Sequence, residues 1–307
     1  MIQPLTKENE SAFERVEFNS QGETLVGNLY LPDNADNASG TLPAIAIVGP
    51  MTYQKEQAPS EYAQRFAQKG YAALVFDPRY RGESSGEPRA FENPNAKVED
   101  IHAAVDFLAQ RNDVNADKIM GMGVCQGSSS MLKAMAENDH IQAAATVAGH
   151  YRDHEGDIEW LTEEGYQARL EKGQKAKDKF EQTGEIDYVA AVDEEDMDVG
   201  MPGKFVWDWY HHWADKGLWE NRYAVMSDAE LLTFESISAA KTIEKPYLMI
   251  HSDYSFLPAA AKRHFEAMPS KTKKLLWEGE TPHLSYYDQP DILDRTANQI
   301  DEYFKAV

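Results

Sequence analysis

The feature that most constrains the fold is a repeated alternation of apolar, strand-like runs with amphipathic, helix-like segments. The run LPAIAIVGP (42–50) is continuously apolar and ends in Gly-Pro, as expected of a strand buried on both faces. A helix-like segment follows it, and YAALVFDP (71–78) repeats the buried-strand pattern. Because parallel strands need a crossover connection, which is usually a helix, this order predicts an α/β fold with a mostly parallel central sheet and helices on both faces.

The same alternation recurs along most of the chain. Residues 14–32 alternate around an Asn-Ser-Gln-Gly turn and predict an antiparallel hairpin at the start of the sheet. The later predicted segments are a helix over 98–111, a strand over 117–124, a helix over 129–138, a strand over 141–149, a strand over 245–253, a helix over 259–268, a strand over 272–279 and a last helix over about 290–304.

Residues 151–240 interrupt this alternation. The segment is charged, rich in aromatic residues and too long for an ordinary connection. It predicts an inserted helical cap that divides the α/β core into residues 1–150 and 241–307. Its WDWYHHW stretch is typical either of simple aromatic packing or of a pocket wall, and we expect Trp207, Trp209 and Trp213 to line an apolar binding site.

Charge and cysteine content exclude several classes of function. Asp and Glu number 52 against 30 Lys and Arg, a net charge of −22 that repels phosphate backbones and anionic lipid surfaces. Nucleic acid and membranes are therefore not expected as partners, which leaves a small-molecule substrate and a monomer or homodimer. A single cysteine forms no internal disulfide and the N-terminus lacks the apolar run of a signal peptide, so a cytoplasmic location is expected.

The stretch GMGVCQGSSS (121–130) carries the clearest chemical signal. Cys125 stands where a strand pattern gives way to a helix pattern, with Gly123 and Gly127 two positions to either side. A nucleophile elbow needs small residues at both positions, because the chain turns too sharply there for larger side chains. The following helix N-terminus is expected to lower the thiol pKa and favour the thiolate. The alternative is a buried structural cysteine.

Several motifs together resemble the α/β-hydrolase superfamily over nearly the whole chain. They are GPMTYQKEQ, FDPRYRGESSGEPR, VEDIHAAVDFL, GVCQGSSS and EGETPHLSYYDQP. More narrowly they resemble the YcjY-like hydrolases and their fungal polyketide-transferase relatives, several of which place cysteine at the elbow. Dienelactone hydrolases also use an elbow cysteine but usually lack so large an insertion, so they rank second. In hydrolases of this kind the counterpart of DPRYRGESSG is a turn, which implies a structural role for Asp77, Arg79 and Arg81.

The resemblance also implies a base and an acid for the nucleophile. His283 is the histidine that follows the last predicted strand, where the superfamily places its base. The acid usually follows the strand at 245–253, but Ser255 stands at its position and Asp253 comes two residues early. Asp153, after the strand at 141–149, occupies the second location for the acid. We favour Asp253 slightly over Asp153.

The oxyanion hole implied by the resemblance consists of backbone N–H groups. One belongs to Gln126, the residue after the nucleophile, and the other to Met51, with Thr52 as the alternative. The expected activity is that of an acyl hydrolase, a carboxylesterase or thioesterase, which forms an acyl-enzyme on Cys125 through a Cys-His mechanism. The alternatives are a dienelactone-hydrolase-like enzyme, an acyltransferase, or a catalytically silent hydrolase-fold binding protein.

No metal or organic cofactor is expected. His150 and His154 are one helical turn apart in HYRDHEGD, but they lack a third ligand.

Overall fold

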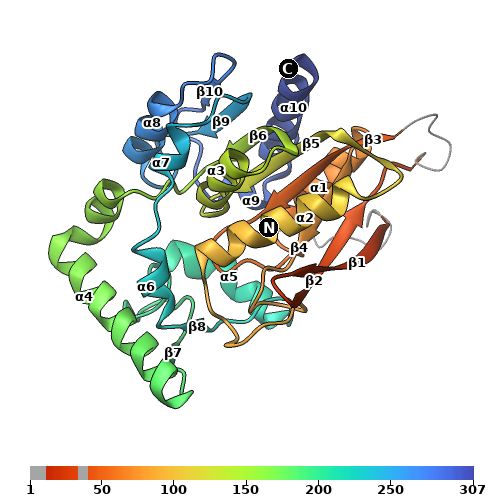
Figure 1. Cartoon of the computed structure of the whole chain (residues 1–307). Helices are drawn as coiled ribbons and strands as arrows, with labels where there is room; N and C mark the ends of the chain where they lie inside the picture. Colours follow the sequence, from red (N-terminus) through yellow and green to blue (C-terminus); the bar gives the residue numbers. More distant parts are fainter. Residues whose placement is uncertain (1–11, 34–40) are drawn as a thin grey trace.

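The computed structural model describes residues 12–33 and 41–307, which form a twisted eight-stranded sheet flanked by helices (Figure 1). The strand order is β1-β2-β4-β3-β5-β6-β9-β10, with β1–β2 and β2–β4 antiparallel and all other pairs parallel. The mostly parallel sheet predicted from the sequence is therefore confirmed. Its strands are β1 (Phe13–Ser20), β2 (Glu23–Tyr30), β3 (Leu42–Val48), β4 (Ala72–Phe76), β5 (Val114–Val124), β6 (Ile141–Val147), β9 (Tyr247–His251) and β10 (Lys274–Trp277).

The hairpin at the sheet edge has the geometry that its turn residues allow. Gln21 and Gly22 connect β1 to β2 with φ values of 52° and 88°, and Ser20 pairs with Glu23. Two consecutive positive φ angles match the twist of adjacent strands, which is why such two-residue turns favour glycine. In the sheet centre, β4 is buried over its whole length, in agreement with its continuous apolar sequence.

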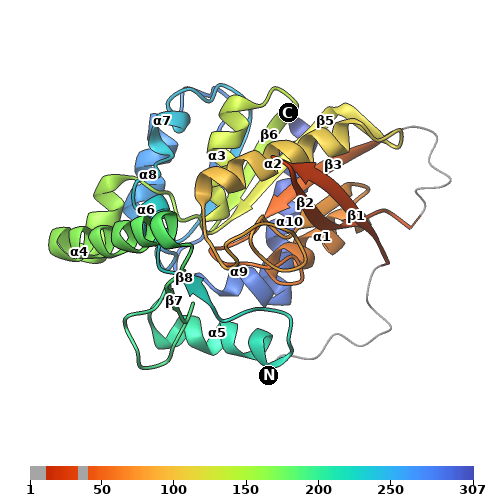
Figure 2. The ribbon, with the colours of Figure 1, turned by 60° about the horizontal axis from the view of Figure 1, so that its bottom comes forward.

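Helices cover both faces of the sheet, as the two views in Figures 1 and 2 show. One face packs against α1 (Ala58–Gln68), α9 (Ser285–Asp288) and α10 (Pro290–Ala306). The other packs against α2 (Pro94–Ala109), α3 (Gly127–Glu137), α7 (Ile237–Ala240) and α8 (Pro258–Ala267). Within the described residues, none of the helices combines the length and the apolar character that crossing a membrane requires.

Residues 151–240 fold into α4 (His154–Thr183), β7 (Tyr188–Val189), α5 (Lys204–Asp215), β8 (Tyr223–Ala224), α6 (Ser227–Leu231) and α7. The helices α4 and α5 agree with the helical character expected of this segment. The helix α4 bends at Thr162, whose φ is 63°, and runs along the outside of the molecule (Figure 1). At Gly173 it approaches α6 so closely that a Cβ would lie 2.6 Å from the Ala229 nitrogen. The short β7–β8 pair and α6 were not predicted, because two to five residues carry no measurable periodicity.

The turn from β5 into α3 brings three backbone segments together. A Cβ on Gly123 would lie 2.7 Å from the carbonyl oxygen of Gly127, and a Cβ on Gly127 would lie 2.5 Å from that of Gly49. Both contacts are far shorter than carbon and oxygen allow. The glycines of the elbow motif are therefore required by packing, and the loop after β3 is held directly against the start of α3.

Gly127→Ala should destabilise the protein by roughly 1–3 kcal/mol or more, because the new methyl group would overlap immobile backbone carbonyls. The matched control is Gly165→Ala in α4, where the nearest atom to the added Cβ is 3.5 Å away. Since alanine favours helix more than glycine does, the control should be unchanged or more stable by about 0.5–1 kcal/mol. The free energy of unfolding from urea denaturation measures both, and equal values for the two variants would contradict the packing argument.

Candidate active site

Cys125 occupies a strained backbone conformation at the carboxyl end of β5. Its φ is 52°, in the left-handed region that costs a non-glycine residue of order 1–3 kcal/mol. Hydrogen bonds hold this turn: the Cys125 N–H donates to the Val147 carbonyl (3.1 Å), and its own carbonyl accepts from the N–H groups of Ser128 and His150 (both 2.9 Å). The strain therefore presents the side chain, which is partly exposed, to a cavity of about 470 Å³.

The groups around the sulfur are hydrogen-bond donors. Burial raises the pKa of the Cys125 thiol, and hydrogen bonds from the Tyr287 hydroxyl and from the backbone N–H groups of Gln126 and Met51 lower it in part. The lowered thiol pKa expected from the helix N-terminus is thus wrong, because desolvation outweighs the donors. At neutral pH most of the sulfur is thiol.

Met51 and Gln126, the residues predicted to supply the oxyanion donors, both act on the Cys125 sulfur through their backbone N–H groups. The alternative donor, the Thr52 N–H, is already bonded to the Glu92 carboxylate (3.1 Å). That carboxylate also pairs with Lys97, which donates to the Gln126 side-chain oxygen (3.1 Å). Glu92 and Lys97 are both buried. A buried ion pair therefore connects the loop after β3 with the elbow and fixes the positions of both donors.

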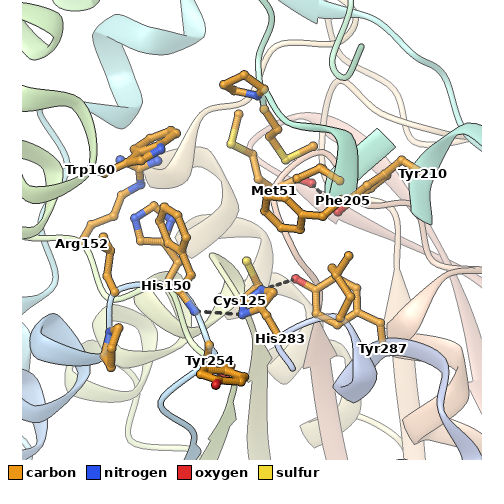
Figure 3. A pocket seen from close by; sticks show the side chains of 18 of the residues that line it. Met51, Cys125, His150, Arg152, Trp160, Phe205, Tyr210, Tyr254, His283 and Tyr287 are labelled. Atoms are coloured by element: carbon orange, nitrogen blue, oxygen red, sulfur yellow. Dashed lines mark hydrogen bonds between the residues drawn. The ribbon is translucent and has the colours of Figure 1, made fainter. Parts of the chain in front are cut away.

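His283 lies beside Cys125 and has an unexpected hydrogen-bonding pattern (Figure 3). Its Nδ1 accepts the backbone N–H of Phe256 (3.2 Å), and its Nε2 is 2.9 Å from the Tyr287 hydroxyl oxygen. An acceptor at Nδ1 places the proton of the neutral ring on Nε2, which then donates to Tyr287. Burial lowers the pKa of His283 to about 3, so the ring stays neutral at higher pH.

Neither candidate acid reaches His283. Asp253 is exposed and accepts a hydrogen bond from the Trp277 indole (2.9 Å). Asp153 caps α4 through the Gly156 N–H (2.7 Å) and binds Arg263 with both oxygens (2.8 and 3.0 Å). In the usual arrangement a carboxylate accepts the proton of Nδ1 and leaves Nε2 free to act as a base. Here a backbone N–H occupies that place and reverses the tautomer.

Tyr287 is a site residue that the sequence reasoning missed. It is buried, and burial raises its pKa well above the usual value, so the hydroxyl stays protonated. The sequence signal that could have found it is spacing: Tyr287, in the short helix α9, follows His283 by four residues, about one helical turn.

The cavity is lined mainly by apolar side chains from the core and from residues 151–240. Val206 and Tyr210 of α5 face it, together with Phe205. The predicted Trp207, Trp209 and Trp213 do not line it. Its lining residues are Met51, Cys125, His150, Arg152, Glu159, Trp160, Met201, Pro202, Phe205, Val206, Tyr210, Tyr254, Ser255, Phe256, Leu257, Pro258, His283, Leu284 and Tyr287.

The tryptophans lie elsewhere because the helix directs them to another side. The Trp209 indole donates to Asp288 (2.8 Å) and packs against the Tyr287 ring, while Trp207 stacks on His211. Residues 206 and 210 are one turn apart on one face of α5, and residue 209 points toward α9. The aromatic stretch therefore supplies packing on one face of α5 and cavity wall on another.

Hydrogen bonds to Asp77 hold the DPRYRGESSG motif in place. The buried Asp77 carboxylate accepts hydrogen bonds from the backbone and side chain of Lys55 (2.8 and 2.9 Å) and from the Glu83 N–H (2.9 Å), which holds the turn after β4.

His150 is buried against Phe256, whereas His154 is exposed and packs on Tyr166. No set of three side chains suited to a metal ion occurs in residues 12–33 and 41–307.

The reaction of Cys125 with iodoacetamide should accelerate through and above pH 9, because the thiolate reacts and the thiol pKa is raised. No inflection is expected near pH 6.5, since His283 is neutral above about pH 3. Tyr287→Phe removes a donor that lowers the thiol pKa, so it should shift the profile to still higher pH. Tyr254→Phe, which removes a hydroxyl from the same cavity, should not.

A plateau of reactivity beginning below pH 7 would instead reveal a thiolate–imidazolium pair and contradict this reading. The tautomer can be measured directly by NMR of protein with ¹⁵N-labelled histidine at pH 7. His283 should give a protonated Nε2 and an unprotonated Nδ1, and the opposite assignment would mean that Phe256 does not control the ring.

Comparison with known proteins agrees with the fold. The family model of the X-Pro dipeptidyl-peptidase (S15 family) matches residues 21–285. An uncharacterized protein from Pseudomonas aeruginosa, PA2218, is 28% identical over 312 residues, which cover 93% of this chain and 79% of that protein. Its crystal structure superposes with a TM-score of 0.80 over 99% of both chains.

Two fungal enzymes are similar to shorter parts of the chain. The thiohydrolase aneE from Aspergillus aculeatus is 32% identical over 145 residues, 47% of this chain and 44% of that protein. The polyketide transferase grgF from Penicillium sp. is 32% identical over 134 residues, 43% of this chain and 44% of that protein. The crystal structure of GrgF, described as an α/β hydrolase, superposes with a TM-score of 0.80 at 24% identity and covers 96% of this chain and 98% of that one.

The family match over most of the chain, the sheet topology and the strained elbow lead to one assignment: the chain is a hydrolase with the α/β-hydrolase fold and belongs to the X-Pro dipeptidyl-peptidase (S15) family.

Proposed function

We propose that the chain is an acyl hydrolase for carboxylic esters or thioesters and that Cys125 is its nucleophile. The observation that carries the proposal is the arrangement at the sulfur. A cysteine in a left-handed elbow turn opens into an apolar cavity, and the backbone N–H groups of Met51 and Gln126 lower the pKa of its thiol. Two backbone donors aimed at one point are what a tetrahedral oxyanion requires.

The proposed reaction begins with loss of the thiol proton to solvent. The Cys125 thiolate then adds to the substrate carbonyl carbon, and the new oxyanion is held by Met51 and Gln126. When the intermediate collapses, the bond to the alcohol or thiol breaks, and the departing atom takes the proton of the Tyr287 hydroxyl, which recovers one from solvent. Water adds to the resulting thioester, the C–S bond breaks, and the acid leaves.

In this scheme His283 positions a proton donor instead of removing a proton. Its Nε2–H donates to the Tyr287 oxygen, so the phenolic proton is directed toward Cys125. The same contact stabilises the phenolate when the proton has left. This role differs from the general base expected of His283 and does not need a carboxylate partner such as Asp253 or Asp153.

Residues 151–240 are proposed to act as a cap over this site. Arg152, Trp160, Met201, Phe205 and Tyr210 all belong to the segment and line the cavity. Tyr210 also donates to the Met51 carbonyl (3.3 Å), on the peptide next to an oxyanion donor. The segment therefore supplies one wall of the cavity and contacts the loop that binds the oxyanion.

Two relatives support acyl chemistry, since one is named a thiohydrolase and the other a polyketide transferase. The S15 family is serine-type, whereas this chain carries cysteine. Cysteine suits the surroundings here, because a thiol ionises without a base far more readily than a hydroxyl does.

Hydrolysis of p-nitrophenyl acyl esters of graded length should be abolished in Cys125→Ala. Cys125→Ser should lose at least about 100-fold, because no lone pair of His283 faces the hydroxyl to activate it. Initial rates of p-nitrophenolate release measure both, and circular dichroism confirms that the variants fold. Turnover that survives in Cys125→Ala would overturn the proposal, and a fully active serine variant would show that a working base is present.

A second candidate function, transfer of the acyl group to an acceptor other than water, is favoured by the His283 tautomer. Deacylation by water normally needs a base, and the ring nitrogen that faces the site is protonated. A thiol acceptor supplies its own nucleophilic anion. Such an acceptor should therefore release the acyl-enzyme faster than water does.

Addition of millimolar N-acetylcysteamine should raise the rate of p-nitrophenolate release and yield the acyl thioester, because deacylation limits turnover. Mass spectrometry of the products distinguishes the thioester from the free acid, with Cys125→Ala as the control for uncatalysed exchange. An unchanged rate with only free acid formed would assign the site to hydrolysis alone.

A further inference from the structure

Arg152 is a buried cation in the wall of the cavity. It follows β6, its side chain is 1% exposed, and it is one of the lining residues. Its Nη1 donates to Asp157 (3.0 Å), while its Nε is buried with no hydrogen-bond partner in the described part of the chain. A guanidinium has five N–H donors, so the single contact to Asp157 leaves most of its donors available to a ligand.

A second unpartnered polar atom lies in the same wall. The His150 side chain is 5% exposed, and its Nε2 has no hydrogen-bond partner in the ranges described. Burial, followed by the charge of Arg152, lowers the pKa of His150 well below the usual value, so the ring is neutral. Unmade hydrogen bonds on buried groups cost of order 1–3 kcal/mol each. Two such groups in one cavity wall indicate a polar subsite that a ligand completes.

The charge in the lining favours an anionic ligand group. Arg152 and Glu159 are the charged lining residues, since His150 and His283 are neutral. The Glu159 side chain is exposed to solvent, whereas the Arg152 side chain is buried. Asp157, which pairs with Arg152, is not a lining residue, so a ligand group that enters the cavity meets the guanidinium and not that carboxylate. The planar guanidinium matches a carboxylate with two parallel hydrogen bonds.

The orientation of the substrate follows from the position of Tyr287. In Figure 3, Tyr287 lies on one side of Cys125, and Arg152 with Trp160 lies on the other. The leaving group must face the Tyr287 hydroxyl that protonates it. The acyl part then extends in the opposite direction, toward Arg152.

We propose that Arg152, assisted by His150, binds a carboxylate at the far end of the acyl group, so that the preferred substrates are esters or thioesters of dicarboxylic acids with one carboxyl group free. The inference rests on the proposed acyl hydrolase function and names its substrate class. Between the two ends, the acyl chain would pass apolar side chains such as Phe256 and Leu257.

The test compares 4-nitrophenyl hydrogen adipate with methyl 4-nitrophenyl adipate, in which a methyl group blocks the far carboxyl group and removes its charge. The wild-type ratio of kcat/KM for acid over methyl ester should be about 10- to 100-fold, and Arg152→Met should reduce that ratio to near one. Suberate and sebacate pairs establish which chain length places the carboxylate at Arg152.

Asp157→Asn is the matched control, because it breaks the same ion pair but keeps the guanidinium. The ratio should be retained or increased in this variant. A wild-type ratio near one at every length, or equal losses of the ratio in Arg152→Met and Asp157→Asn, would overturn the inference and leave the hydrolase proposal standing.

Complete absence of turnover would instead overturn the proposed function. In that case, ligand binding near Arg152 is measured by how strongly a bound ester slows the reaction of Cys125 with iodoacetamide at pH 9. Monomethyl adipate should protect the wild type at lower concentration than dimethyl adipate does, and Arg152→Met should abolish the difference. Equal protection by both esters would overturn the carboxylate subsite.

Discussion

The close backbone contact between Gly127 and Gly49 is the constraint on which the site depends. No Cβ fits between these two residues, so the start of α3 lies directly against the loop that follows β3. This contact brings the N–H groups of Gln126 and Met51 to the same sulfur, although the two residues are distant in sequence. The buried Glu92–Lys97 pair then fixes both segments from behind. The proposed oxyanion site thus depends on backbone packing between Gly127 and Gly49, which this ion pair reinforces.

The electrostatics around Cys125 depend on the group that contacts Nδ1 of His283, where a hydrolase usually has a carboxylate. A carboxylate at Nδ1 would make Nε2 of His283 an acceptor, whereas the Phe256 N–H makes it a donor. The groups that contact the sulfur, from Met51, Gln126 and Tyr287, are donors as well. The site is therefore built to stabilise negative charge once it has formed, and burial opposes its formation. Those opposing effects explain how a thiol with a raised pKa can sit in surroundings suited to an anion.

Local sequence patterns sufficed for the elbow and the order of strands, because small residues and periodicity are local requirements. The strained turn at Cys125 between Gly123 and Gly127 could be predicted in this way, whereas Gln126 and Met51 were expected only from the resemblance to α/β-hydrolases. The environment of His283 could not be predicted. It depends on how the loops after β9 and β10 meet and on a backbone N–H that any residue except proline would supply at position 256. The prediction that the tryptophans of α5 line the cavity was wrong for a related reason. Composition reveals an aromatic helix, but only the rotation of the helix about its axis decides which face lines the cavity.

The acidity of the chain and its buried arginine act over different distances. With a net charge of −22, the protein repels an approaching anion, but at physiological ionic strength this repulsion fades within about 8 Å of the surface. The Arg152 guanidinium lies inside the cavity, where screening is weak and a paired hydrogen-bonding geometry is available. For a carboxylate substrate, added salt would therefore raise the association rate while hardly changing the contact at Arg152. Selectivity in this molecule would reside in the cavity wall supplied by residues 151–240, while the chemistry resides in the core sheet.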